Sequence, residues 1–136
     1  PVACTSPQQF TTRATPFYDR VLPAVLEHTY SPSIGMVYAV ACDRDGYIPV
    51  HNTGMNQPQR PHDIDYNLRF SRNRRIYDDN ATLRSARFAR DVVIQTYIRD
   101  LENDPNRIVK SVAAPIHVHG QRWGCVSIGF AIKDRA

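Results

Sequence analysis

The sequence has few cysteines, and their spacing excludes several kinds of site. Cys4, Cys42 and Cys125 are an odd number, and no two of them form a Cys-x-x-Cys pair. A disulfide framework is therefore not indicated, and the absence of Cys-x-x-Cys-His argues against a covalently attached c-type haem. Cys42 and Cys125 lie in apolar runs typical of strands, where a free cysteine behaves as a small hydrophobic residue. The cysteines thus favour a reducing compartment.

Long apolar runs and the common catalytic motifs are missing as well. No apolar run approaches the roughly 18 residues that a membrane-spanning helix needs. The sequence has no glycine-rich phosphate loop, and Ser127 is not part of a Gly-x-Ser-x-Gly elbow. Asp78 and Asp79 are adjacent carboxylates, but neighbours on a helix point apart. We therefore expect that the protein is not an enzyme, with a small α+β enzyme of unknown class as an alternative.

The residues that are present have the size and composition of one globular domain. The chain has 136 residues, of which 42% are hydrophobic. We expect a single domain over 1–136, with an N-terminal helical region at 1–30 and a sheet with a helical insert at 36–136. The net charge is +4, and much of it comes from an arginine-rich stretch at 69–90. Acidic residues in and around this stretch favour intramolecular ion pairs, so we expect no nucleic-acid partner.

The N-terminal region carries the signals of a helix that begins near Ser6. Ser6 can cap the helix, Pro7 suits the first helical position, and Gln9 completes a capping box. Apolar residues then recur at helical spacing, at Phe10, Ala14, Phe17 and Val21. Pro16 removes an amide donor, so we expect a kink or a restart at Thr15-Pro16.

The rest of the chain predicts a sheet with a helical insert. Strand-like composition occurs at 36–42, 47–52, 90–100 and in both halves of 109–130. The two halves of 109–130 flank a short polar turn, which indicates a hairpin. In the insert, Asp63 can cap a short helix, and 74–80 is predicted to be a second helical or turn segment. Because tight turns join consecutive strands, we predict an α+β fold with a five-stranded antiparallel sheet, in which the helical insert lies between strands two and three.

Several segments resemble a known family of sensor domains. The Ala-Pro-Ile and Trp-Gly elements of the closing hairpin resemble those of Cache/PAS-type sensor domains in bacterial chemoreceptors. Three further segments are similar to a sensor family associated with methyl-accepting chemotaxis proteins. They are Asp-Arg-Asp-Gly-Tyr-Ile-Pro-Val-His-Asn at 43–52, Arg-Asn-Arg-Arg-Ile-Tyr-Asp-Asp at 72–79 and Gln-Thr-Tyr-Ile-Arg-Asp at 95–100. The loops at 54–58 and 101–107 depart from that family's pattern.

The resemblance implies a PAS/Cache-like ligand-sensing domain of a chemotaxis receptor. Such a domain binds a small molecule and transmits a conformational signal to the signalling domain of the same receptor. We further expect a homodimer on the cytoplasmic side of the membrane, with a periplasmic position as the alternative. The amine-binding motif of Cache domains, Tyr…Arg-x-Trp-Tyr, is absent, so amine binding is not predicted. A protein-interaction or dimerisation module without a small ligand remains a second alternative.

Two groups of polar residues near the expected cover of the sheet are candidates for the ligand site. His51 and Asn52 end the second expected strand and lead into the covering loop. Their alternative role is to bond to the loop backbone and fix the turn. Arg72, Arg74 and Arg75 could bind an anionic ligand, because guanidinium groups recognise carboxylates bidentately. Their alternative role is pairing with nearby aspartates.

Further candidates lie on the expected third strand and on the closing hairpin. Gln95, Tyr97 and Arg99 share strand parity and therefore one face, which lines a pocket or faces solvent. Trp123 is included as a ligand-site candidate, although a core or interface position fits it better. Gly124 beside it indicates a close approach of backbones.

Histidines offer a possible metal or haem site. His117 and His119 alternate on one strand face, and this spacing can bind zinc with His62 or an aspartate as third ligand. Exposed histidines on a hairpin are the simpler interpretation. We therefore expect neither a metal nor a cofactor, and a haem bound through one histidine is an alternative.

Overall fold

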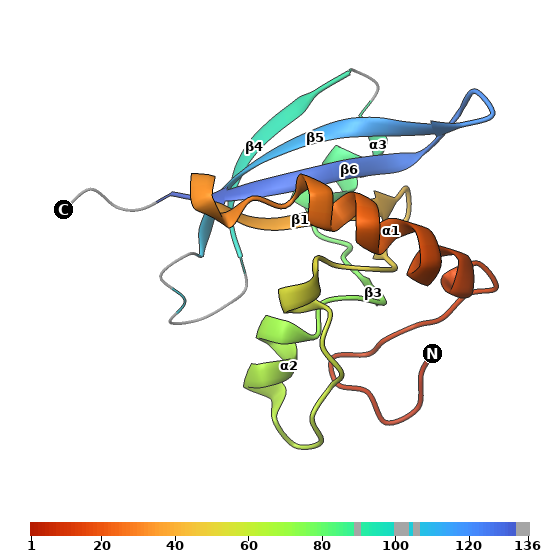
Figure 1. Cartoon of the computed structure of the whole chain (residues 1–136), viewed down its shortest axis with the longest axis vertical. Helices are drawn as coiled ribbons and strands as arrows, with labels where there is room; N and C mark the ends of the chain where they lie inside the picture. Colours follow the sequence, from red (N-terminus) through yellow and green to blue (C-terminus); the bar gives the residue numbers. More distant parts are fainter. Residues whose placement is uncertain (89–90, 100–103, 105–106, 133–136) are drawn as a thin grey trace.

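The computed structural model describes residues 1–88, 91–99, 104 and 107–132, and these residues form an α+β fold (Figure 1). The helices are α1 (Thr15–Thr29), α2 (Ile64–Phe70) and α3 (Asn80–Arg87), with short 3-10 helices η1 (Pro32–Ile34) and η2 (Thr53–Met55). The strands are β1 (Met36–Asp43), β2 (Tyr47–Ile48), β3 (Arg75–Ile76), β4 (Val93–Ile98), β5 (Ile108–Val118) and β6 (Gln121–Ala131).

The main sheet is antiparallel, with the strand order β1-β6-β5-β4. Strands β5 and β6 form the long closing hairpin, which confirms the hairpin predicted from the sequence. Its turn is made by His119 and Gly120, which both have positive φ angles, of 50° and 76°. Glycine adopts this left-handed conformation at no steric cost. The antiparallel prediction is therefore confirmed for the described strands.

The described residues form a four-stranded main sheet, one strand fewer than predicted. The second expected strand, 47–52, contributes only β2, which pairs with β3 in a separate two-stranded sheet. After Pro49, which lacks an amide donor, only an isolated bridge joins His51 to Val40 of β1. The side chain of Asn52 accepts the amide of Ala39 at 3.1 Å. A loop and a side chain therefore cover the edge of β1, where a strand was expected.

The helical insert was predicted correctly in its first half only. Asp63 caps α2 by accepting the amide of Tyr66 at 3.0 Å, as expected. The segment 74–80 is not helical, because it contains β3 and the approach to α3. Arg74 has a φ of 58°, a left-handed conformation that a right-handed helix cannot include. The second helix of the insert, α3, begins later, where Asp79 caps it.

The prediction that the N-terminal helix begins near Ser6 is wrong. Helix α1 begins at Thr15, and Pro16 lies in its first turn, where a missing amide donor is tolerated. The segment before α1 is held instead by tertiary hydrogen bonds. The Phe10 amide donates to the Arg74 carbonyl at 2.7 Å, and the Gln9 side chain donates to the Asn73 carbonyl at 3.0 Å. These bonds take the place of the first helical turns.

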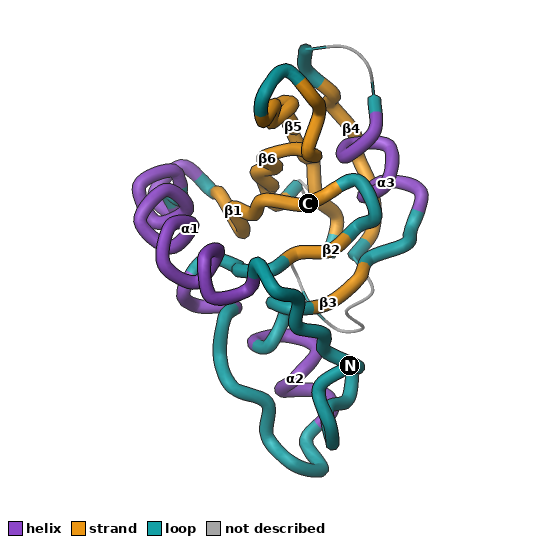
Figure 2. The backbone as a smooth tube through the Cα atoms, turned by 90° about the vertical axis from the view of Figure 1, so that its right-hand side faces the viewer, coloured by secondary structure: helices purple, strands orange, loops and turns teal. Residues whose placement is uncertain are grey.

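The main sheet has one layer on each face. Figure 2 shows α1 on one side of the sheet and α3 with the β2-β3 pair on the other. The Trp123 indole of β6 donates to the Tyr18 hydroxyl of α1 at 3.2 Å. On the opposite face, the Arg122 guanidinium donates to the Ser85 carbonyl of α3 at 3.0 Å. None of the described helices is both long and apolar enough to span a membrane.

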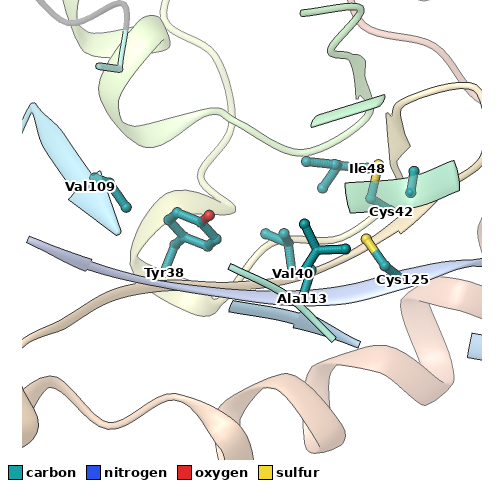
Figure 3. Packing of buried hydrophobic residues seen from close by; sticks show 9 residues of the cluster. Tyr38, Val40, Cys42, Ile48, Val109, Ala113 and Cys125 are labelled. Atoms are coloured by element: carbon teal, nitrogen blue, oxygen red, sulfur yellow. The ribbon is translucent and has the colours of Figure 1, made fainter. Parts of the chain in front are cut away.

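The hydrophobic core lies on the face of the sheet that is turned away from α1. Figure 3 shows side chains such as Tyr38, Val40 and Cys125 rising from the sheet, with α1 below the sheet on its other side. Alternation along the strands places these residues on one face. The same face carries the polar residues described next.

Candidate functional site

A cavity of about 420 Å³ lies between the main sheet and its cover. The sheet contributes side chains from β1, β4, β5 and β6, and the cover contributes the loop after β2, α2, the segment around β3 and the start of α3. Ligand pockets in proteins have volumes of roughly 300–1,000 Å³. The cavity is therefore large enough for a small molecule.

The sheet side of the cavity carries a cluster of hydroxyl groups. The Tyr38 hydroxyl lies 2.8 Å from that of Tyr97 and 3.3 Å from that of Ser127. The Ser111 hydroxyl is buried beside the same cavity and has no hydrogen-bond partner among the described residues. Burial raises the pKa of the Tyr38 and Tyr97 phenols. Both phenols therefore stay protonated near neutral pH and can donate a hydrogen bond.

His51 lies at the inner end of the cavity in a defined tautomer. Its Nδ1 is 2.7 Å from Asn52 Oδ1, which also accepts the Ala39 amide. Because an oxygen faces Nδ1, this nitrogen must carry the proton. Burial, followed by the charge of Arg72, holds the pKa of His51 well below its usual 6.5. The ring is therefore neutral near pH 7, and its Nε2 is a hydrogen-bond acceptor at the cavity.

The buried neutral state of His51 predicts a pH dependence of stability. Below pH 6.5 the histidine takes up a proton in the unfolded chain but not in the folded chain. The free energy of unfolding should therefore fall as the pH drops below 6.5, by up to about 1.4 kcal/mol per pH unit from this group. Chemical denaturation of the protein between pH 7.5 and pH 5 measures this slope.

A variant pair isolates the contribution of His51. His51→Asn keeps a donor at the position of Nδ1 and removes the titrating ring. The free energy of unfolding should therefore change less steeply with pH, by up to about 1.4 kcal/mol per pH unit. His117→Asn, at an exposed position on β5, should keep the slope of the unaltered protein. Equal slopes in all three proteins would contradict a neutral, buried His51.

Arginines form the cationic part of the cavity. Arg99 is only 6% exposed, and its guanidinium donates to Met55 Sδ at 3.8 Å. Burial, followed by the charge of Arg72, lowers the pKa of Arg99. Arg72 donates to the Leu68 carbonyl at 2.8 Å, and its guanidinium lies 5.3 Å from the centre of the Tyr77 ring. Arg75 stacks on the same ring at 4.8 Å.

Acidic residues belong to the exposed part of the cavity lining. Asp78 and Asp79 both line the cavity and are both exposed. Asp79 is engaged in capping α3, because its carboxylate accepts the amide and the hydroxyl of Thr82 at 2.9 and 2.8 Å. The cavity is therefore positive at its buried end and negative in its exposed part.

Part of the lining is apolar and includes both buried cysteines. Cys42 of β1 lies directly opposite Cys125 of β6, so the two side chains share the cavity face. Burial raises the pKa of Cys125 to about 11 and that of Cys42 further. Protonated thiols beside Val40 and Ile48 act as small apolar groups. This wall suits the carbon skeleton of a ligand.

The cavity brings together five of the nine residues that the sequence suggested. A polar set from both layers lines it, namely His51, Arg72, Arg75, Tyr97 and Arg99. The face shared by Tyr97 and Arg99 is therefore the covered face of the sheet.

The other four candidates lie outside the cavity lining. Asn52 is buried and holds His51 and the edge of β1. Arg74 forms an ion pair with Asp19 of α1 at 2.8 Å. Gln95 donates to the Ala81 carbonyl of α3 at 2.9 Å, and Trp123 packs against α1 on the far face. Each of these side chains has a protein partner.

Tyr38, Ser111 and Ser127 line the cavity but were missed by the sequence analysis. The sequence did contain a signal that could have identified them. Each is a polar residue two positions from a buried apolar one on the same strand, namely Val40, Ala113 or Cys125, and residues at this spacing share a face. The alternative of a histidine metal site has no support in the described part of the chain, where no group of three His, Cys, Asp or Glu side chains could hold a metal ion.

Comparison of the chain with family models, with curated proteins and with solved structures finds no match. The function must therefore be argued from the chemistry of the cavity and not from the fold.

Proposed function

We propose that the chain is the ligand-sensing domain of a bacterial chemotaxis receptor. In this role it binds a small molecule between its sheet and cover and passes a conformational signal to the signalling domain of the same receptor. The proposal is supported by the position of the three segments that resemble the chemoreceptor family, because all three reach the same cavity. The segments 43–52, 72–79 and 95–100 contribute His51, Arg72 and Tyr97 to one cavity. Residues far apart in sequence thus supply polar groups to a single concave site, as a binding function requires.

An ion pair and a backbone hydrogen bond connect the cover of the cavity to α1 and to the segment before it. Arg74 lies next to the cavity residue Arg75 and forms an ion pair with Asp19 of α1. The carbonyl of Arg74 accepts the amide of Phe10, in the segment that leads into α1. A ligand that favours one position of the cover would therefore favour one packing of α1. This is a population shift, in which the signal equals the difference in ligand affinity between two states.

The cytoplasmic face of the membrane, or alternatively the periplasm, is the proposed location of such a receptor domain. Homodimerisation is also proposed, and exposed apolar residues support it. Ile94 and Ile98 of β4 are 65% and 61% exposed, and Phe17 and Val25 of α1 are 52% and 56% exposed. The same residues favour a dimerisation module as the second candidate function. Sedimentation velocity of Ile94→Ser against the unaltered protein tests this second role.

A thermal-shift screen tests ligand binding directly. The panel consists of organic acids, amino acids, purines, divalent metals and haem. A ligand present at a hundred times its dissociation constant stabilises the folded state by about 2.7 kcal/mol, so a true ligand should give a clear and saturable rise in melting temperature. A flat response from well-folded protein across the panel would count against sensing and favour the dimerisation module.

A further inference from the structure

The buried end of the cavity holds two arginines that repel each other. Arg99 is 6% exposed and Arg72 is half-buried, both line the cavity, and the charge of Arg72 lowers the pKa of Arg99. No ion pair with a carboxylate is formed by either residue within the described ranges, although the charge of Asp104 raises the pKa of Arg99. Keeping a buried guanidinium group in one cavity with a second, half-buried one is unfavourable unless an anion compensates them. The arrangement therefore leaves a place for a negatively charged group.

The neutral His51 adds a second requirement to the ligand. Its Nδ1 proton is used by Asn52 Oδ1, so Nε2 offers only a lone pair. His51, Arg72 and Arg99 line the same cavity, and the charges of both arginines lower the pKa of the ring. The guanidinium N–H groups can donate to such a nitrogen, but a carboxylate bound on the arginines takes these donors. A ligand hydroxyl is the group that would satisfy Nε2 beside a bound carboxylate.

The rest of the cavity limits the ligand to an organic one. Its volume of about 420 Å³ exceeds what a single inorganic anion fills, and Val40, Ile48, Cys42 and Cys125 form an apolar wall. The unpartnered Ser111 hydroxyl adds a further polar contact on the sheet side. An amine would have to enter the positive end of the cavity, which the two arginines disfavour.

We infer that the cavity binds a small hydroxy acid, with its carboxylate on Arg72 and Arg99 and its hydroxyl donating to Nε2 of His51. The inference rests on the sensing function proposed above and names the ligand class of that same site. Arginine suits this role because its planar donors match the two oxygens of a carboxylate.

Matched ligands test the inference on the unaltered protein. Titration calorimetry compares lactate with propionate and lactamide, malate with succinate, and all of these with inorganic phosphate. The hydroxy acids should bind about tenfold or more tightly than the acids without the hydroxyl, because the latter leave Nε2 unpaired. Lactamide, which keeps the hydroxyl but has no charge, should show no binding.

Three variants assign the contacts. Arg72→Gln and Arg99→Gln should each weaken hydroxy-acid binding about tenfold or more, since a charge-assisted bond is lost. His51→Asn keeps the donor to Asn52 and removes Nε2, so it should bind lactate and propionate equally. Arg44→Gln is the matched control, because Arg44 is exposed in the turn after β1 and does not line the cavity, and its affinity should be unchanged.

The outcomes separate this inference from the sensing function. Equal binding of lactate and propionate, binding of lactamide, or tighter binding of phosphate than of any acid would overturn the hydroxy-acid assignment. Failure of every acid to bind, while a purine or an amine raises the melting temperature, would overturn it and leave the sensing function intact. If nothing in either panel binds, both proposals are wrong.

Discussion

Replacing Gly124 with alanine should destabilise the fold by about 3 kcal/mol or more, at the upper end of the usual cost of overpacking. A Cβ atom at this position would lie 1.9 Å from the Cys42 carbonyl oxygen and 2.7 Å from the Asp43 Cα. Both atoms belong to the backbone of β1, which cannot rotate away as a flexible side chain could. Strand β1 would have to move off β6, and the wall of the cavity that contains Cys42 would move with it.

Thermal unfolding of Gly124→Ala measures this cost. For a domain of this size, about 3 kcal/mol corresponds to a fall in melting temperature of roughly 10 °C. Gly54→Ala is the matched control, because a Cβ at Gly54 meets no atom within 4 Å. That variant should stay within about 0.5 kcal/mol of the unaltered protein. A Gly124→Ala variant as stable as Gly54→Ala would show that β1 and β6 are not packed this closely.

The sequence predicted well the features that depend on local chemistry. The closing hairpin follows from two β-branched runs around a polar turn, and the cap of α2 follows from Asp63. The close approach at Gly124 was indicated by a glycine inside a strand. Tyr97 and Arg99 share a face because strand parity is fixed by geometry. These predictions require only neighbours in the sequence.

The features that depend on distant contacts were missed. The capping box at Ser6 does not form a helix, because Gln9 and Phe10 bond instead to the backbone near Arg74. Such tertiary hydrogen bonds override a local helix signal. The second expected strand ends early because Asn52 uses its side chain, and not its backbone, to satisfy β1. No pattern within 47–52 specifies that partner.

The residues of the site were also predictable only as far as they depend on neighbours in the sequence. Strand parity placed Tyr97 and Arg99 together, but it could not show whether their face was covered. Arg74 and Arg75 are adjacent and chemically equal, yet the left-handed backbone at Arg74 directs one to α1 and leaves the other at the cavity. The position of α1, which is distant in sequence, therefore helps to decide which arginine lines the cavity.

Replacing Asn52 with alanine should destabilise the fold by about 2–4 kcal/mol. Asn52 is 1% exposed, and its Oδ1 accepts from both the Ala39 amide and His51 Nδ1. Each buried donor that loses its acceptor costs about 1–3 kcal/mol. His51 can recover part of the loss by moving its proton to Nε2, but the Ala39 amide has no such alternative. The edge of β1 would therefore be left with an unsatisfied donor.

Chemical denaturation compares Asn52→Ala with Asn80→Ala, an exposed asparagine at the start of α3. The control should change stability by no more than about 0.5 kcal/mol. A double-mutant cycle of Asn52→Ala with His51→Phe, which has no donor to offer, then isolates the bond between the two side chains, for which we expect a coupling of about 1 kcal/mol. If Asn52→Ala is as stable as the control, the amide does not hold His51, and the argument that fixes the tautomer of His51 loses its basis. A clear loss with measurable coupling would show that the same amide closes the sheet edge and orients the cavity histidine.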